Sequence, residues 1–178
     1  MRTIVIAAVL ALAAAPTALA GPSPTAADRA AAVNDCRILR SAPPAGMGLE
    51  AFRETYGTNA NRMNAFGRCV RRMVAAEHAN RHEAERECRA ERGTTPESRA
   101  AFREKYGSLG RCIRANRREE SAEDRERIMN AAETCREERG TTDESRAAFN
   151  EEYGTNENDR NAFGKCVSRQ ARAQNDDD

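Results

Sequence analysis

Residues 135–167 read CREERGTTDESRAAFNEEYGTNENDRNAFGKCV, and this stretch decides the fold because the chain contains it in three versions. The second copy, residues 88–113, reads CRAERGTTPESRAAFREKYGSLGRCI and lacks seven residues of the third. The first copy begins less regularly at Cys36, returns to the pattern at Phe52 and ends in the same run, NAFGRCV at 64–70. Self-similarity of this kind is the signature of a repeat architecture.

Helix signals accompany each copy. A Phe and a Tyr four residues apart, followed by glycine, place two rings on one face of a short helix. Gly93 and Gly140 follow charged turns and suit the C′ position, where a positive φ is needed. The run Thr94-Thr95-Pro96-Glu97 supplies an N-cap and a first-turn proline. A second helix then carries the other cysteine on its apolar stripe, as Phe66 and Cys69 illustrate.

A glycine lies two residues before the second cysteine of every copy, at Gly67, Gly110 and Gly164. Glycine weakens a helix interior by roughly 1 kcal/mol relative to alanine. We therefore expect a facing backbone to approach closely at all three positions.

The stretches between consecutive copies contain neither proline nor glycine, which predicts helices that run from one unit into the next. On such helices Cys69 and Cys88 would lie about 28 Å apart, and Cys112 and Cys135 about 35 Å. A disulfide needs Cα atoms within roughly 7 Å. Six cysteines allow about 15 connectivities. The repeat and this geometry favour pairing within each unit: Cys36–Cys69, Cys88–Cys112 and Cys135–Cys166.

The first 20 residues, MRTIVIAAVLALAAAPTALA, have the order of a signal peptide: Arg2, an apolar run, Pro16 and a small-x-small site at 18–20. About 13 apolar residues are short of the ~20 that span a bilayer. An even number of cysteines in an exported chain indicates disulfides. We expect a secreted protein, extracellular or periplasmic, without membrane insertion after cleavage.

These observations predict an all-α fold of three tandem, disulfide-stapled helical hairpin repeats joined by long charged helices into an elongated string. Only eight aromatic residues are present, five Phe and three Tyr, which excludes a large apolar core. As a helix, 117–127 would be solvated on nearly all sides. The expected segments are a signal peptide (1–20), a flexible linker (21–31), repeat 1 (32–76), a bridging helix (77–87), a short repeat 2 (88–116), a charged bridging helix (117–130), repeat 3 (131–170) and an acidic disordered tail (171–178).

The polar runs TNANRMN at 58–64 and TNENDRN at 155–161 are candidate binding features that copy two lacks. One interpretation is an elaborate helix start, with Thr58, Asn59, Thr155 and Asn156 as caps. The other is a recognition surface for sugar or peptide, in which amides lie beside a tyrosine. Its members would be Tyr56, Asn59, Asn61, Asn64, Tyr153, Asn156, Asn158 and Asn161.

The chain has two histidines, His78 and His82, spaced i,i+4 on the first bridging helix. That spacing can present two imidazoles to one metal ion. Ala79 stands where an HExxH motif has its glutamate, and the surroundings are charged, so the alternative interpretation is exposed helix residues. No nucleophile constellation accompanies the pair, and we predict no catalytic residue and no cofactor.

The net charge excludes a strong general attraction to polyanions. From Gly21 onward 28 basic residues balance 28 acidic ones, because Arg2 is the only charged residue before it. A neutral chain has no overall attraction to nucleic acid, although local patches remain possible. We therefore expect no nucleic-acid partner.

The pattern Cys…FxxxYGTN…NAFGKCV resembles a repeat in exported bacterial proteins to which no activity is assigned. The resemblance covers most of residues 36–167, and the run 161–167 is its most specific part. Copy two departs from it by its deletion, and copy one by its proline loop. The resemblance implies export and the repeat but transfers no site.

The leading hypothesis is a secreted, disulfide-stabilised helical repeat protein that acts as an extracellular or cell-envelope interaction or structural module. Its partner is unknown; an envelope protein or a polysaccharide fits the polar runs. A second hypothesis is a metal-binding protein that uses His78 and His82. A third is an enzyme that acts on cell-wall polymers.

Overall fold

The computed structural model describes residues 23–156 and 158–176, and every regular element in them is an α-helix. The seven helices of this described part are α1 (Ala26–Arg40), α2 (Leu49–Tyr56), α3 (Ala65–Arg92), α4 (Pro96–Tyr106), α5 (Leu109–Arg139), α6 (Asp143–Tyr153) and α7 (Ala162–Asp176). The all-α prediction is confirmed. The expected signal peptide, 1–20, lies outside the described residues.

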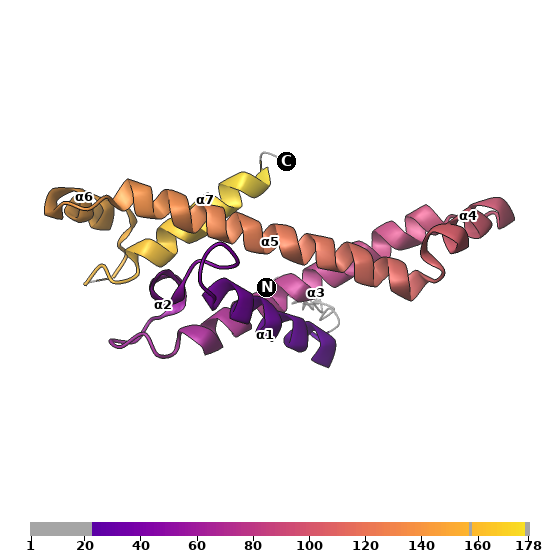
Figure 1. Ribbon diagram of the computed structural model, residues 1–178, viewed down its shortest axis with the longest axis horizontal. Helices are drawn as coiled ribbons and strands as arrows, with labels where there is room; N and C mark the ends of the chain where they lie inside the picture. The colour runs from indigo at the N-terminus through magenta and orange to yellow at the C-terminus, as the bar shows by residue number, and fades with distance from the viewer. Residues whose placement is uncertain (1–22, 157, 177–178) are drawn as a thin grey trace, which may run out of the picture.

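The two longest helices, α3 and α5, pack against each other and run in opposite directions (Figure 1). α3 continues unbroken through residues 77–87 into the second copy, and α5 continues through 117–130 into the third. α4 connects them at one end, whereas α2 and α6 lie toward the other end (Figure 1). The sequence therefore predicted correctly that both bridging stretches are continuous helix.

The local signals for helix ends act as expected. Thr95 and Thr142 cap α4 and α6, each accepting a hydrogen bond from the backbone N–H three residues later at 3.1 Å. Ser108 caps α5 in the same way at 3.3 Å. Gly93 and Gly140 end α3 and α5 with φ of 59° and 61°, in the left-handed region that favours glycine.

Helix extends further at both ends of the described chain than the sequence suggested. Thr25 opens α1 with a capping box: its hydroxyl accepts from Asp28 N at 3.2 Å, and the Asp28 carboxylate accepts from Thr25 N at 2.7 Å. Residues 26–31 of the expected linker, 21–31, are therefore helical. α7 continues to Asp176 and so takes in most of the expected tail, 171–178, of which residues 177–178 lie outside the described part.

Three disulfides join the helices: Cys36–Cys69, Cys88–Cys112 and Cys135–Cys166, the pairing expected from the sequence. They link α1 to α3, α3 to α5 and α5 to α7, each with Cα atoms 6.0 Å apart. Three disulfides indicate an oxidising, extracellular environment. Within the described residues, no helix combines the length and the apolar character needed to cross a membrane.

The buried apolar side chains form two clusters rather than three. The larger cluster combines the first and third copies, with Phe52 and Phe149 in the same core as their two disulfides. The second copy has a small cluster of its own, which consists of Phe102 and the Cys88–Cys112 bridge with a few partly buried neighbours. A string of separate units was expected. Instead α3 and α5 fold back on each other, and this brings their partners α1 and α7 into one assembly.

The close backbone approach predicted at three glycines occurs at one. A Cβ on Gly164 would lie 2.6 Å from the carbonyl oxygen of Thr55 in α2. Around a Cβ on Gly67 nothing lies within 4 Å, and one on Gly110 would meet only the Arg114 guanidinium, at 3.5 Å. The prediction was wrong for these two because the contact belongs to the packing of α7 on α2, not to the repeat.

Candidate functional site

The two polar runs, 58–64 and 155–161, form loops that are closed by their own side chains. Asn64 Oδ1 accepts from Thr58 N at 3.0 Å, and Asn64 Nδ2 donates to Thr58 Oγ1 at 2.8 Å. Asn161 and Thr155 make the same pair of bonds at 3.2 and 2.6 Å. Thr58 and Asn59 are not the caps of α3, because its N-cap residue is Asn64, which makes no side-chain capping bond.

The remaining members of the predicted recognition surface are dispersed. Asn61 and Asn158 each accept a hydrogen bond from a backbone N–H two residues later, at 3.0 and 3.2 Å, within their own loops. Asn59 and Asn156 lie exposed in the same loops. Two of the eight candidates, Tyr56 and Asn161, line a common cavity. The recognition surface therefore stays a prediction.

Tyr56 and Tyr153 are buried, not displayed beside amides. Each packs on the Phe four residues earlier, with ring centroids 5.0 and 4.9 Å apart. Tyr153 donates its hydroxyl to Glu138 at 2.7 Å. Burial raises the pKa of both phenols to about 12, so that both stay protonated at neutral pH. In the structure these two buried rings hold the short helices α2 and α6 on the core.

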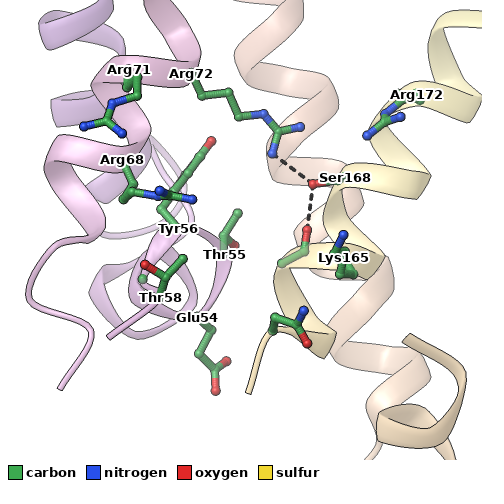
Figure 2. Close-up of a pocket in the computed structure, with 13 residues that line it drawn as sticks. Glu54, Thr55, Tyr56, Thr58, Arg68, Arg71, Arg72, Lys165, Ser168 and Arg172 are labelled. Atoms are coloured by element: carbon green, nitrogen blue, oxygen red, sulfur yellow. Dashed lines mark hydrogen bonds between the residues drawn. The ribbon is translucent and has the colours of Figure 1, made fainter. Parts of the chain in front are cut away.

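A cavity of about 470 Å³ lies between the first and third copies (Figure 2). One wall is α3 and the other is α7, and residues 54–58 at the end of α2 together with Asn161 complete the lining. We call this cavity the basic cleft because five of its side chains are cationic: Arg68, Arg71, Arg72, Lys165 and Arg172. Cations thus enter it from both walls.

The positive charge of the basic cleft is not neutralised by its one acidic lining residue, Glu54. Both oxygens of this carboxylate face other partners: Oε1 accepts from Arg62 at 3.1 Å and Oε2 from Arg139 at 2.9 Å. Within the described residues, the three cleft arginines on α3 (Arg68, Arg71 and Arg72) and Lys165 form no ion pair. An almost neutral chain therefore concentrates positive charge at one place.

One hydrogen bond crosses the basic cleft from wall to wall. Arg72 Nη1 donates to Ser168 Oγ at 2.9 Å, and the Ser168 hydroxyl donates to Gly164 O at 2.7 Å (Figure 2). The Tyr56 side chain points toward the arginines of α3 (Figure 2), and the charge of Arg72 partly opposes the rise of its pKa. Guanidinium groups bind carboxylates and phosphates through two parallel hydrogen bonds. The chemistry available here is the binding of oxyanions.

The histidines lie side by side on α3, and the guanidinium of Arg81 lies next to them. The rings of His78 and His82 are in edge contact, with centroids 4.6 Å apart. Arg81 Nη2 lies 3.1 Å from His78 Nδ1, and Arg81 Nε lies 3.2 Å from Asp28. His78 Nδ1 also lies 3.5 Å from Asp28 Oδ2, and the guanidinium beside both groups repels a metal ion. Both rings are partly buried rather than exposed, and the metal hypothesis stays a prediction.

A buried polar network, absent from the sequence-based expectations, joins α1, α3 and α5. Glu77 is 1% exposed and accepts from Arg117 Nε at 2.9 Å and from Ser121 Oγ at 2.6 Å. Asp35 accepts from Arg125 Nη1 at 2.6 Å. The prediction that 117–127 is solvated on nearly all sides was wrong. Its polar residues 117, 121 and 125 are four apart and form one stripe, a signal that could have been read.

Neither a metal site nor a known relative adds to this picture. In the part of the chain that the structure describes, one group of three possible ligands lies within 4.8 Å, namely Cys135, Glu138 and Cys166, and its cysteines are bonded to each other. Comparison with family models, with curated proteins and with solved structures finds no match. The functional argument therefore depends on the geometry of the site.

Proposed function

We propose that this chain is an exported, disulfide-stabilised helical repeat protein that binds anionic groups in the extracellular space or the cell envelope. The observation that carries the proposal is the basic cleft, where five cationic side chains from the first and third copies meet in a chain with balanced charge. Oxyanions of an envelope polysaccharide or of an acidic protein would be its ligands.

The three copies are, on this proposal, versions of one structural unit. Each contains a Phe and Tyr pair with ring centroids 4.9–5.0 Å apart, and each is closed by one disulfide. Copies one and three pair to build the cleft, and copy two extends away from them at the far end of α3 and α5 (Figure 1). This arrangement supports an elongated molecule with its binding site in one half.

Binding, rather than catalysis, fits the groups in the cleft. A hydroxyl that attacks a substrate needs a neighbouring base to take its proton. The hydroxyl of Ser168 faces the guanidinium of Arg72, which stays protonated and cannot accept one. The cationic groups of the lining are suited to holding a negative ligand in place.

The experiment is calorimetric titration of the mature, oxidised chain with dextran sulfate and with uncharged dextran. We expect binding of the sulfated polymer only, weakening as salt is added because the attraction is electrostatic. A triple variant, Arg68→Gln with Arg71→Gln and Lys165→Gln, should bind at least tenfold more weakly.

The matched control removes the same charge from the distal part of the molecule. Arg89→Gln, Arg99→Gln and Arg103→Gln change three exposed residues at the end of α3 and in α4. We expect this variant to bind dextran sulfate within twofold of the unmodified protein. Equal losses in the two triple variants would show that net charge, and not the basic cleft, is responsible, and the proposal would then be wrong.

A further inference from the structure

A second cavity continues the basic cleft along the same two helices. Its volume is about 410 Å³, and it shares Arg72 and Arg172 with the basic cleft. α5 supplies part of its lining through Ile128, and the small residues Ala76 and Ala171 come from α3 and α7. The two cavities are therefore adjacent along α3 and α7, with the shared arginines at their junction, and we call the two together the groove.

The acidic residue in the second cavity does not reverse the charge of the groove. Asp124 is paired with Arg127, and its other oxygen accepts from Asn80 Nδ2 at 2.8 Å. Because this ion pair is neutral as a whole, the shared arginines still make the second cavity positive. A negatively charged ligand can thus extend beyond the basic cleft without meeting a free carboxylate from the groove lining.

The groove is long compared with a single oxyanion. On α3 the lining runs from Arg68 to Ala76, which are eight residues apart, or about 12 Å at 1.5 Å per residue. On α7 the cations Lys165 and Arg172 are seven residues apart, about 10 Å along the axis. α3 and α7 run in the same direction along the cleft (Figure 2). Arg68 and Lys165 therefore lie toward one end of the cleft, and Arg72 and Arg172 lie toward the other.

We propose that this groove binds a linear polyanion through two or more consecutive charged units, rather than a single small anion. The inference rests on the proposed function and names its ligand class. Successive oxyanions would contact Lys165 and Arg68 first and the shared arginines next, and the chain would continue over Ala76 and Ala171. Short side chains at these two positions leave room for the polymer backbone. Phosphate and carboxylate polymers share this chemistry.

The test is a length series with the mature, oxidised chain. Orthophosphate, pyrophosphate and long linear polyphosphate are titrated by calorimetry, and each affinity is expressed per phosphate unit. This corrects for the greater number of positions at which a longer polymer can bind. We expect the long chain to bind at least tenfold more tightly per unit than orthophosphate. Equal affinity per unit would overturn the inference.

This outcome separates the inference from the proposed function. If all three phosphates bind with equal affinity per unit and all lose binding in the Arg68, Arg71 and Lys165 triple variant, the anion-binding cleft stands and the linear ligand is wrong. If neither the phosphates nor dextran sulfate binds, both proposals fail. When the phosphate series shows the gain, long polyglutamate, compared with glutamate per carboxylate, distinguishes the source of the oxyanions: a similar gain means that carboxylate polymers also bind, and no gain means that the groove selects phosphate polymers.

Variants in the second cavity supply an independent readout. Ala76→Glu places a negative charge in the extension of the groove, and we expect it to weaken long polyphosphate at least fivefold while orthophosphate binding changes less than twofold. Ala75→Glu is the matched control, because Ala75 is exposed on α3 and does not line the groove. Equal effects of the two substitutions on the long chain would contradict the proposed path. Far-UV circular dichroism checks that both variants are folded.

Discussion

Arg125 Nη1 lies 2.6 Å from Asp35 Oδ1 and so ties α5 to α1 inside the molecule. The second oxygen of Asp35 is buried and has no hydrogen-bond partner among the described residues. Burial and the neighbouring Glu77 carboxylate raise the pKa of Asp35 to about 7, although the charge of Arg125 opposes this. Near neutral pH the carboxyl group is therefore close to the point at which it loses its proton.

We expect the free energy of unfolding to decrease as the pH rises from about 4 to about 7. Asp35 has its ordinary pKa of 3.8 in the unfolded chain, so in this window the folded state binds more protons than the unfolded state. Asp35→Asn mimics the protonated form and should be more stable than the unmodified protein at pH above 7, by about 1–3 kcal/mol. Urea unfolding at several pH values measures this, and a difference that stays constant with pH would contradict it.

Asp28 should show the opposite dependence, in stronger acid. Burial raises its pKa, but hydrogen bonds from Thr25 and from Arg81 outweigh this effect and lower it to about 2. The stabilisation from Asp28 is complete above its unfolded pKa of 3.8 and is lost as the pH falls toward 2. Asp28→Asn should therefore cost stability at neutral pH and much less near pH 2, measured by the same urea series.

The ion pair between Arg117 and Glu77 should be essential for stability. Arg117→Met leaves a carboxylate that is 1% exposed without its cation, and removing one partner of a buried pair costs about 3–5 kcal/mol. Arg118→Met removes the exposed neighbour, which forms no ion pair within the described chain, and should change stability by about 0.5 kcal/mol or less. Similar urea midpoints for the two variants would show that the network contributes little.

The three glycines before the second cysteines should respond differently to the same substitution. Gly164→Ala places a Cβ 2.6 Å from Thr55 O and should destabilise the protein, because a backbone atom must move. Gly67→Ala and Gly110→Ala have room and should stabilise it by up to about 1 kcal/mol through helix propensity. Thermal unfolding of the three variants tests this, and a uniform response would contradict the packing of α7 on α2.

Loss of the Cys88–Cys112 bond should unfold only the distal part of the molecule. The bond closes a loop of 24 residues and is worth about 3 kcal/mol in the chain-entropy model. Little else holds α4, because its cluster is small and separate. In the double Cys→Ser variant we expect hydrogen exchange to accelerate in residues 93–110 and to stay unchanged in α1 and α7. Faster exchange throughout the chain would show that the two clusters unfold together.

Local features of this fold could be predicted from the sequence, and its assembly could not. Thr95, Gly93 and the cysteine spacing determine helix ends and bridges through neighbouring residues, and the structure agrees with them. The core that the first and third copies share forms because α3 and α5 pack against each other, and this contact joins residues that are far apart in the sequence. For the same reason the identical signals at Gly67 and Gly164 lead to different surroundings.

The basic cleft was missed for a related reason. Arg72 and Ser168 are 96 residues apart in the chain, and Arg68, Arg71 and Arg72 do not stand out among 29 basic residues until α7 lies beside them. The asparagine-rich runs are the more conspicuous feature of the sequence, but amides in both of them are used within their own loops. Of these candidates, Tyr56 and Asn161 do line the cleft, because each lies next to one of its walls.

Every connection between two helices lies within a span that a disulfide closes, while the stretches between consecutive bridges, 69–88 and 112–135, are unbroken helix. Proteases cut exposed connections far more readily than helices. A peptidase that nicks this protein at any connection would thus leave both fragments covalently attached. Both walls of the groove would remain tethered to the same cut molecule, so that a single cleavage would not separate them.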